Sequence, residues 1–209
     1  MCHSRTRETI DPVRFISNRS TGKMGFALAK NAMERGADVT LVSGPVELKD
    51  VPFVKMVHVE SARQMFEAVT KEAETADIIV KAAAVADYRP AVVADEKIKK
   101  KDGDMSIALE RTDDIIGTLG KTKRDNLFLC GFSMETEHML ENSKAKLEKK
   151  NLDMIIANNV KVKGAGFGTD TNVVTLITKD EIKELPIMSK EDVADEIFNN
   201  ILANRKGIV

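Results

Sequence analysis

Apolar residues along this chain follow two alternating patterns. Nearly continuous apolar runs, each typical of a buried strand, lie at 37–42, 77–80, 127–132 and 152–157, and residues 54–59 alternate as a further strand. Between and after them, apolar residues recur at helical spacing over 24–33, 61–76, 137–150 and from 189 or 190 to about 204. Continuous rather than alternating runs indicate a mostly parallel sheet with helices on both faces. The pattern therefore predicts an α/β fold in three layers.

The remaining elements predicted by the pattern are shorter. Residues 105–109 alternate like a strand, and a short helix is expected from Asp113 to Gly120. Residues 173–177 and 182–185 predict an antiparallel hairpin late in the chain. No internal repeat or low-complexity segment divides the sequence. We expect one domain over 1–209, with an atypical start at 1–5.

A polar loop at 17–23 leads into the first helix and suits an anion. Ser20 and Thr21 are favourable helix caps, and Arg19 and Lys23 add positive charge. A capped surface helix with solvated cations explains the pattern equally well. The loop is not a P-loop, because it has Ser17 in place of the first glycine and Met24 in place of the hydroxyl residue. It also lacks the glycine spacing of a dinucleotide loop.

Ligands of parallel α/β sheets bind beyond the carboxyl ends of the strands. Those ends are expected at Ser43–Gly44, Ala82–Asp87, Phe132–Glu135 and Ala157–Asn158. The small residues after the 77–80 strand would let a flat ring approach the backbone. This edge of the sheet is therefore the expected site.

Two groups of lysines could contact a charged ligand at this edge. The segment 91–104 carries Lys97, Lys99, Lys100 and Lys101, which fits either a solvated loop or a mobile lid. Lys146 and Lys150 are four residues apart, so both face one side of a helix. A solvated basic face is the simpler interpretation, and contact with a triphosphate is the alternative.

Composition excludes several classes of function. The chain has 209 residues, 43% hydrophobic and 31% charged, which is enough for a core. A net charge of −1 predicts neither a nucleic-acid partner nor membrane attraction. Two distant cysteines and no apolar leader fit the cytoplasm. His58 is expected to be structural, and neither a catalytic triad nor a paired metal motif is present.

Several long blocks together resemble one enzyme family. They are TRE at 6–8, IDPVRFISNRSTGKMGFALA at 10–29, KAAAVADYRP at 81–90, EKIKK at 96–100, GFSMETE at 131–137, KLEKKNLDMIIAN at 146–158 and GAGFGTDTN at 164–172. These blocks resemble bacterial phosphopantothenate–cysteine ligase, the C-terminal half of the bifunctional coenzyme A biosynthesis flavoprotein. The resemblance covers nearly the whole chain from Thr6 onward.

The resemblance implies a Rossmann-like fold, a homodimer and a ligase reaction that needs Mg2+. CTP would activate the carboxylate of 4'-phosphopantothenate as an acyl-cytidylate and release pyrophosphate, and the amine of cysteine would then displace CMP. Asn18 would hold the acyl-cytidylate, Lys97 would be the lid lysine, and Arg19, Ser20 and Gly22 would bind substrate. The implied nucleotide contacts are Ala82, Ala83, Ala84, Asp87, Lys97, Asp113, Asp114, Ile115, Ile116, Phe132, Lys146 and Lys150. No metal ligand is assigned.

The sequence departs from the family pattern in three places. Family members usually have an apolar strand and a Gly-Gly-Thr turn before TRE, whereas this chain has the polar MCHSR. We therefore expect the first, central strand to be missing. The flavin-binding half is absent, so neither FMN binding nor decarboxylation is expected on this chain. Asp113 stands where the family commonly has proline, and Asp114 keeps the match.

Two alternatives to an active ligase remain at this point. A remnant of the ligase would bind nucleotide but turn over poorly because its first strand is lost. A nicotinamide-dependent oxidoreductase would fit the fold class but lacks the glycine fingerprint. Pyrophosphate release, CTP binding without release, and nicotinamide binding would separate the three.

Overall fold

The computed structural model describes residues 2–3, 5–100, 102–134, 138–158, 166 and 168–205. Its centre is an eight-stranded sheet in the order β13-β12-β10-β9-β6-β1-β4-β5. The strands are β1 Cys2–His3, β4 Thr40–Ser43, β5 Lys55–His58, β6 Ile78–Lys81, β9 Phe128–Met134, β10 Met154–Asn158, β12 Val174–Ile177 and β13 Ile182–Glu184. The six strands from β10 to β5 are parallel, whereas β12 and β13 are antiparallel. The predicted parallel sheet and late hairpin are confirmed.

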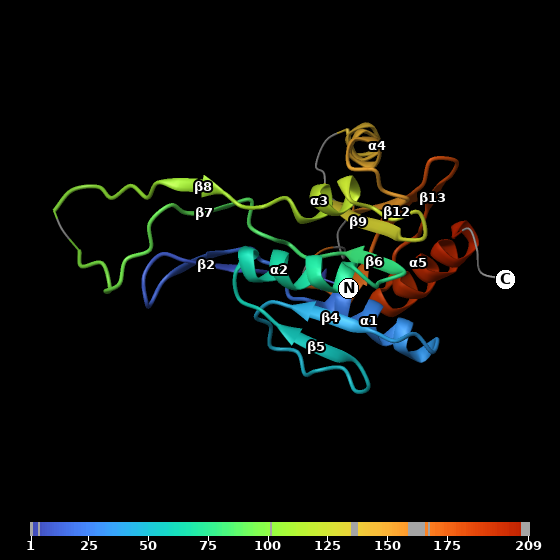
Figure 1. Cartoon of the computed structure of the whole chain (residues 1–209), viewed down its shortest axis with the longest axis horizontal. Helices are drawn as coiled ribbons and strands as arrows, with labels where there is room; N and C mark the ends of the chain where they lie inside the picture. Colours follow the sequence, from blue (N-terminus) through green and yellow to red (C-terminus); the bar gives the residue numbers. More distant parts are fainter. Residues whose placement is uncertain are drawn as a thin grey trace.

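Helices cover both faces of the sheet (Figure 1). The helices α1 Lys23–Glu34 and α5 Lys190–Asn204 pack together in one hydrophobic core. A second core, on the opposite face, includes residues of α2 Ala62–Ala73, α3 Ile115–Lys121 and α4 Met139–Lys149. The predicted three layers are therefore present.

Neighbouring strand residues contribute to opposite cores. Leu41 and Val80 belong to the α1–α5 core, whereas Val42 and Ile79 belong to the core under α2 and α3. Successive side chains of a strand point to opposite faces, so a strand covered on both sides needs apolar residues at every position. This requirement explains the continuous apolar runs.

Three helices, α2, α3 and α5, begin at a residue whose side chain caps the first turn, whereas α1 does not. Ser61 forms a reciprocal capping box with Gln64, and Asp114 and Ser189 cap α3 and α5. The prediction that Ser20 or Thr21 caps α1 is wrong. The N-cap is Gly22, with φ of 85° and no side-chain cap. This left-handed backbone conformation favours glycine over a residue with a Cβ atom.

A strand at 105–109 is also a wrong prediction. The observed strand is β8 Leu109–Arg111, which pairs with β7 Tyr88–Pro90. Met105 is 59% exposed, so the alternating pattern there faces no core. Alternation predicts a strand only where one face is buried.

The expectation of a missing first strand is corrected as well. β1 lies between β4 and β6, with Cys2 paired to both Val42 and Lys81 and His3 paired to Ser43. Main-chain pairing depends on backbone groups, so a polar sequence can supply two residues of ladder. The strand is nevertheless only two residues long, against four in each neighbour.

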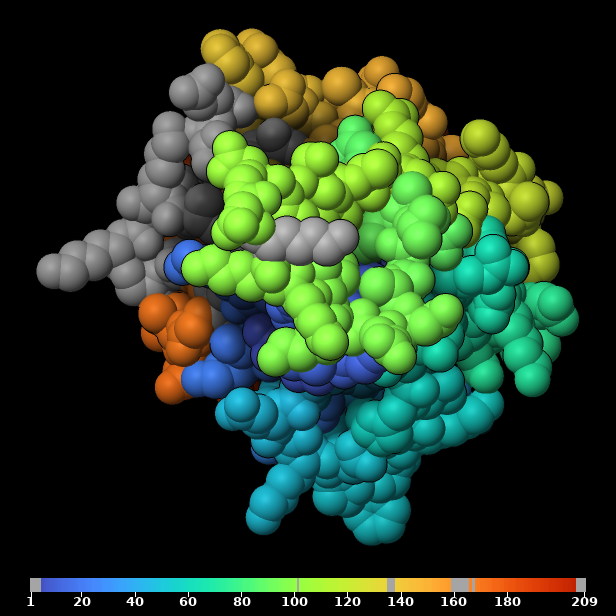
Figure 2. Space-filling view, turned by 90° about the vertical axis from the view of Figure 1, so that its left-hand side faces the viewer, coloured from blue at the N-terminus to red at the C-terminus, as the bar shows by residue number. Residues whose placement is uncertain are grey.

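An arm extends away from the sheet (Figure 1). It contains β2 Arg7–Thr9 with β3 Phe15–Ser17, and β7 with β8 and the long loop between them. Figure 2 views the molecule from the end of this arm, where the loop covers the residues behind it. One further small pair joins β11 Thr171–Asn172 to β14 Met188–Ser189.

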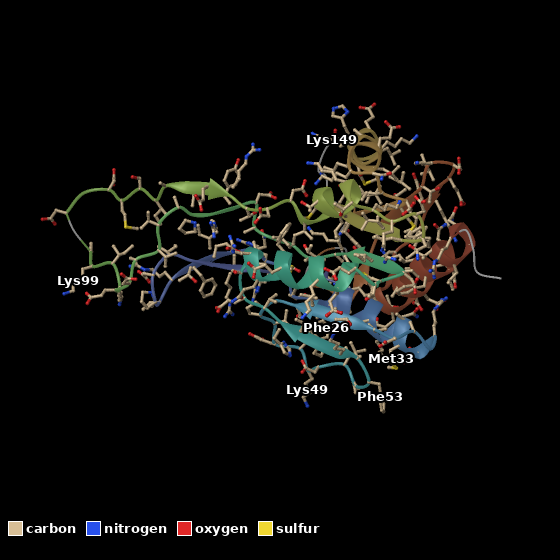
Figure 3. The ribbon with its side chains drawn as sticks, viewed as in Figure 1. Phe26, Met33, Lys49, Phe53, Lys99 and Lys149 are labelled. Atoms are coloured by element: carbon tan, nitrogen blue, oxygen red, sulfur yellow. The ribbon has the colours of Figure 1, made fainter. Side chains whose placement is uncertain are left out.

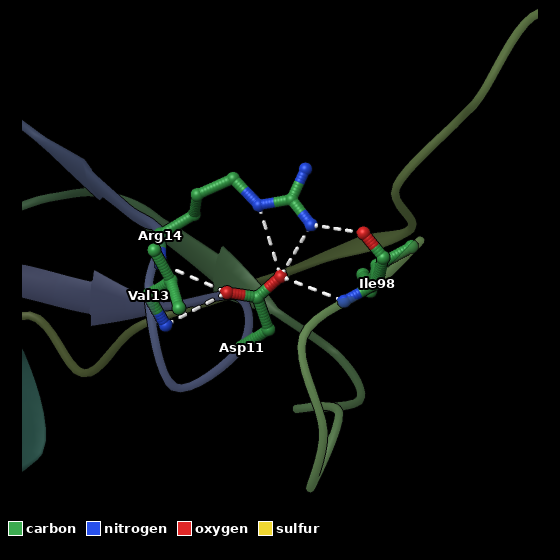
Figure 4. Close-up of polar contacts among 4 residues, drawn as sticks. All are labelled: Asp11, Val13, Arg14 and Ile98. Carbon is green, nitrogen blue, oxygen red and sulfur yellow. Dashed lines mark hydrogen bonds and ion pairs between the residues drawn. The ribbon is translucent and has the colours of Figure 1, made fainter. Parts of the chain in front are cut away.

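Asp11 anchors the loop of the arm (Figure 4). Its carboxylate accepts hydrogen bonds from the Val13, Arg14 and Ile98 amides and from the Arg14 guanidinium. Arg14 also donates to the Ile98 carbonyl at 2.7 Å. The hydrogen bond from the Arg14 guanidinium is the main reason that the pKa of Asp11 lies far below its usual range. These contacts fix residue 98 within the segment predicted to be a lid.

Candidate functional site

A pocket of about 470 Å³ lies at the carboxyl edge of the sheet, between β6, β9, β10 and α3. Eight predicted nucleotide contacts line it: Asp87, Asp113, Asp114, Ile115, Ile116, Phe132, Lys146 and Lys150. Segments that are distant in sequence therefore meet at one place. This pocket is called the lysine pocket below.

Two glycines allow α3 to form a wall of the lysine pocket. A Cβ atom on Gly131 would lie 2.5 Å from Ile116 Cδ1, and one on Gly120 would lie 1.9 Å from the backbone oxygen of Lys150. Real Cβ atoms do not approach other atoms so closely. The two glycines thus bring α3 against β9 and against the turn that carries Lys150.

Lys150 forms an ion pair with Asp114 in the pocket. Its Nζ lies 3.1 Å from each carboxylate oxygen of Asp114. Partial burial raises the pKa of Asp114, but the Gly117 amide, Lys150 and the charge of Lys81 together bring that pKa below its usual value. Asp114 therefore stays ionised and holds Lys150 at the pocket. An incoming phosphate would compete for the same ammonium group.

A smaller pocket of about 120 Å³ lies at the start of α1. Its walls include Ser20 to Met24, Ala82 to Ala84, and Phe132. The first-turn amides of α1 lack a side-chain cap and carry the positive end of the helix dipole. The pocket therefore suits an anionic group. It is called the helix pocket below.

Phe132 lines both pockets, so they meet at this residue. Ala82, Ala83 and Ala84 line the helix pocket rather than the lysine pocket. These small side chains follow β6 directly, as the sequence indicated, and leave space at the junction.

Asn18 lies beside the helix pocket. Its Nδ2 donates to the Ala84 carbonyl at 2.8 Å, which leaves the amide oxygen on the other side of the group. Ser20 and Gly22 line the helix pocket, whereas Arg19 is exposed and lines neither pocket. Three of the four predicted substrate contacts are thus near one another.

Lys97 does not lie at either pocket in this structure. It is exposed on the arm, next to the anchored Ile98. Figure 3 marks the neighbouring Lys99 at the far end of the arm, well away from α4. The lid role of Lys97 stays a prediction.

Sequence reasoning missed a buried lysine at the helix pocket. Lys190 is only 4% exposed and donates to the carbonyls of Gly166 and Thr169. Burial, followed by the charge of Lys23, lowers its pKa. Lys23 itself pairs with Asp170 at 2.7 Å. A lysine at the first position of an apolar-faced helix is the one signal that could have identified this residue.

The side chains of the described residues show whether the site could hold a metal ion. Among the described residues, no group of three or more His, Cys, Asp or Glu side chains is placed to hold an ion. The lysine pocket still offers the carboxylates of Asp87, Asp113 and Asp114. Mg2+ commonly uses one or two carboxylates together with substrate phosphates. The donors therefore fit an ion that arrives with a nucleotide.

The fold and the edge pockets define a Rossmann-like α/β protein, with its cavities where such sheets bind ligands. The family model of the DNA/pantothenate metabolism flavoprotein C-terminal domain matches residues 3–204. The chain belongs to this family. Within the part of the chain that the structure describes, no helix is long and apolar enough to cross a membrane.

Named relatives agree with this assignment. The chain is 52% identical over 204 residues to the coenzyme A biosynthesis bifunctional protein CoaBC of Bacillus subtilis, covering 96% of this chain and 50% of that protein. It therefore spans about half the length of the curated relatives it matches. The crystal structure of the C-terminal domain of a CoaBC protein superimposes with a TM-score of 0.82 at 48% identity, covering 97% of this chain and 93% of that one.

A more distant neighbour supports the fold alone. The Cab2 H337A mutant, solved in complex with phosphopantothenate-cysteine, has a TM-score of 0.77 at 15% identity. The two chains are covered to 97% and 85%.

Proposed function

We propose that this chain is a ligase of coenzyme A biosynthesis that joins 4'-phosphopantothenate to cysteine at the expense of CTP. In the first step a carboxylate oxygen of phosphopantothenate bonds to the α-phosphorus of CTP, and the bond to the leaving pyrophosphate breaks. In the second step the amine of cysteine bonds to the acyl carbon and CMP leaves. The observation that carries the proposal is the junction of two pockets at Phe132.

The lysine pocket is the proposed site of the triphosphate. Lys150 and Lys146 lie four residues apart beside α3, and Lys81 lines the same pocket. Negative charge builds on the leaving pyrophosphate during the first step, and ammonium groups stabilise it electrostatically. The Asp114–Lys150 pair supports this role because it positions the lysine before the nucleotide binds.

The helix pocket is the proposed site of the reacting carboxylate. The uncapped amides of α1 offer neutral donors, and Asn18, whose Nδ2 donates to the Ala84 carbonyl, lies beside them. Held here, a carboxylate would face the α-phosphate across the junction at Phe132. Orientation of the two reactants accounts for most of the expected rate gain, since no covalent enzyme intermediate is required.

Magnesium is proposed to enter with CTP. The carboxylates of Asp87, Asp113 and Asp114 are the groups that would hold the ion or its waters. When bound, it would neutralise phosphate charge. Lys97 is proposed to complete the site in a conformation in which the arm is closed.

A homodimer is proposed from the surface of the arm. Seven of its apolar side chains are 46–81% exposed: Val13, Phe15, Tyr88, Val92, Val93, Met105 and Leu109. Apolar surface of this extent commonly marks a protein interface.

We further propose a cytoplasmic location. The buried, unpaired thiol of Cys130 is consistent with a reducing compartment.

The test is pyrophosphate release from CTP and 4'-phosphopantothenate before cysteine is added. The proposal expects a burst of about one equivalent per active site, followed by turnover when cysteine arrives. CTP binding without any release would instead support a nucleotide-binding remnant. Release that does not require phosphopantothenate would contradict the proposed first step.

A further inference from the structure

Lys190 occupies an unfavourable position for a lysine. It is the first residue of α5, and only 4% of its surface is exposed. The N-terminus of a helix carries the positive end of the helix dipole, so a cation is disfavoured there. Burial adds to this cost, because a buried charge is normally paired with an opposite charge. A compensating group is therefore expected close to the ammonium of Lys190.

The hydrogen-bond partners of Lys190 are neutral. Its Nζ donates to the Gly166 carbonyl at 3.1 Å and to the Thr169 carbonyl. The charge of Asp170 acts on Lys190, but the carboxylate of Asp170 itself pairs with Lys23 at 2.7 Å. Across the described ranges of the chain, no carboxylate forms an ion pair with Lys190. The positive charge of this lysine is thus only partly compensated by its neighbours.

These contacts fix the ammonium group of Lys190 at the helix pocket. Lys190 and Gly166 both line that pocket, together with Asn172. The main chain at the start of α5 is held as well, because the Lys190 amide donates to the Asp170 carbonyl at 2.9 Å. Directly before it, β14 pairs with β11. The side chain of Lys190 therefore stays beside the pocket.

Positive groups meet at the helix pocket from two helices. The uncapped start of α1 lines it through Gly22 and Lys23, and Lys190 lines it from α5. An ammonium group has three N–H donors, of which two reach carbonyls of the described residues. An oxyanion in the pocket would accept from the third N–H and would relieve the repulsion between Lys23 and Lys190.

The size of the helix pocket fits one charged group. Its volume of about 120 Å³ is well below the range of about 300–1,000 Å³ that is usual for a whole small-molecule ligand. A carboxylate or a single phosphate group is the part of a substrate that such a volume admits.

We propose that Lys190 is a substrate-binding residue whose ammonium group contacts an oxyanion in the helix pocket, through the N–H that the loop carbonyls leave unused. The oxyanion is the carboxylate of 4'-phosphopantothenate or a phosphate oxygen of CTP, which present the same chemistry to an ammonium group. This inference rests on the proposed ligase function. The bound oxyanion supplies the counter-charge that Lys190 lacks, which explains a lysine buried at the start of a helix.

The test compares two ligands that differ only at the carboxylate. One is 4'-phosphopantothenate, and the other is its alcohol analogue, in which a hydroxymethyl group replaces the carboxylate. Each is titrated calorimetrically into the full chain, saturated with a CTP analogue that cannot release pyrophosphate. Lys190→Met should weaken binding of the acid by about 10- to 150-fold and leave the alcohol nearly unchanged. Lys190→Arg keeps the charge and should retain part of the preference for the acid.

Titration of the CTP analogue alone separates the two sources of the oxyanion. A loss confined to the acid identifies the carboxylate, whereas a similar loss in affinity for the CTP analogue identifies a phosphate oxygen. Lys183→Met is the matched control. Lys183 also contacts α5, through Glu196 at 2.7 Å, but it lines neither pocket. Its loss should leave every affinity within about twofold of the parent.

Asp170→Asn provides a second variant that keeps Lys190 in place. The Asp170 side chain is 85% exposed, so its substitution should leave the fold intact. It removes a negative charge that acts on both Lys23 and Lys190. Binding of the acid or of the CTP analogue should therefore tighten by about two- to fivefold.

Thermal melts distinguish binding from a purely structural role of Lys190. A structural lysine would lower the melting temperature on change to Met while both affinities matched those of Lys183→Met, and this result would overturn the proposal. If Lys190→Met does not fold, unchanged affinities in Asp170→Asn would overturn it instead. A parent chain that binds neither the acid nor the CTP analogue would contradict the ligase function and this inference with it.

Discussion

Lys150→Met is the substitution that tests the lysine pocket most sharply. The change keeps most of the side-chain length and removes the ammonium group, with its charge and its hydrogen-bond donors. Lys150 is partly buried, with 28% of its side chain exposed, and lies 3.1 Å from both oxygens of Asp114. Its loss removes one cation from the proposed triphosphate site and leaves the Asp114 carboxylate without its counter-charge.

The expected loss of CTP affinity follows from the contact that Lys150→Met removes. A hydrogen bond to a charged group contributes about 1.5–3 kcal/mol. At tenfold per 1.4 kcal/mol, CTP binding should weaken by about 10- to 150-fold. The ion pair with Asp114 offsets part of this loss, because free Lys150 already has a partner. The lower half of the range is therefore expected.

The assay is calorimetric titration of CTP into the variant and into Lys149→Met as a matched control. Lys149 is the exposed neighbour on α4 and lines neither pocket (Figure 3). Lys149→Met should bind CTP within about twofold of the parent, since an exposed charge that lines neither pocket is screened by water and salt. Equal weakening by both variants, or unchanged binding by Lys150→Met with an unchanged melting temperature, would refute the reasoning.

Four further changes are predicted. Gly120→Ala drives a Cβ into the backbone oxygen of Lys150, so thermal melts should show a loss of about 1–3 kcal/mol. The pKa of Asp11 is depressed, so the stabilisation that its carboxylate gives the arm is present above about pH 4 and is lost as the pH falls below that value. Proteolysis of the arm should therefore become faster in acid. In Asp11→Asn the rate of proteolysis should not depend on acid pH. Asn18→Asp places an anion beside the substrate carboxylate and should slow turnover by about 100-fold with an unchanged melting temperature, while Lys97→Gln should accumulate acyl-cytidylate in quenched reactions.

The fold was largely predictable because burial on two faces leaves a strong signal. The apolar runs that became β6, β9 and β10 are buried in the sheet. The turn that carries Gly22 was not predictable from Ser20 and Thr21, since backbone torsion rather than hydroxyl chemistry decides that cap. β1 was missed because its pairing uses main-chain groups, and the pattern of apolar and polar side chains does not report on main-chain pairing.

The candidate site was predictable in part for a related reason. Parallel strands end at one edge, so Asp87, Phe132 and Lys150 could be expected to converge. The role of Lys190 was hidden, because its partners are backbone carbonyls of a loop about 20 residues earlier in the chain. The position of Lys97 depends on the conformation of the arm, which no local pattern specifies.

The most direct test of the central claim is exchange of labelled pyrophosphate into CTP without cysteine. If carboxylate and α-phosphate meet at the junction of the two pockets, exchange should require 4'-phosphopantothenate and fall strongly in Asn18→Asp. Exchange that proceeds without phosphopantothenate, or none in a chain that binds both substrates, would contradict the account.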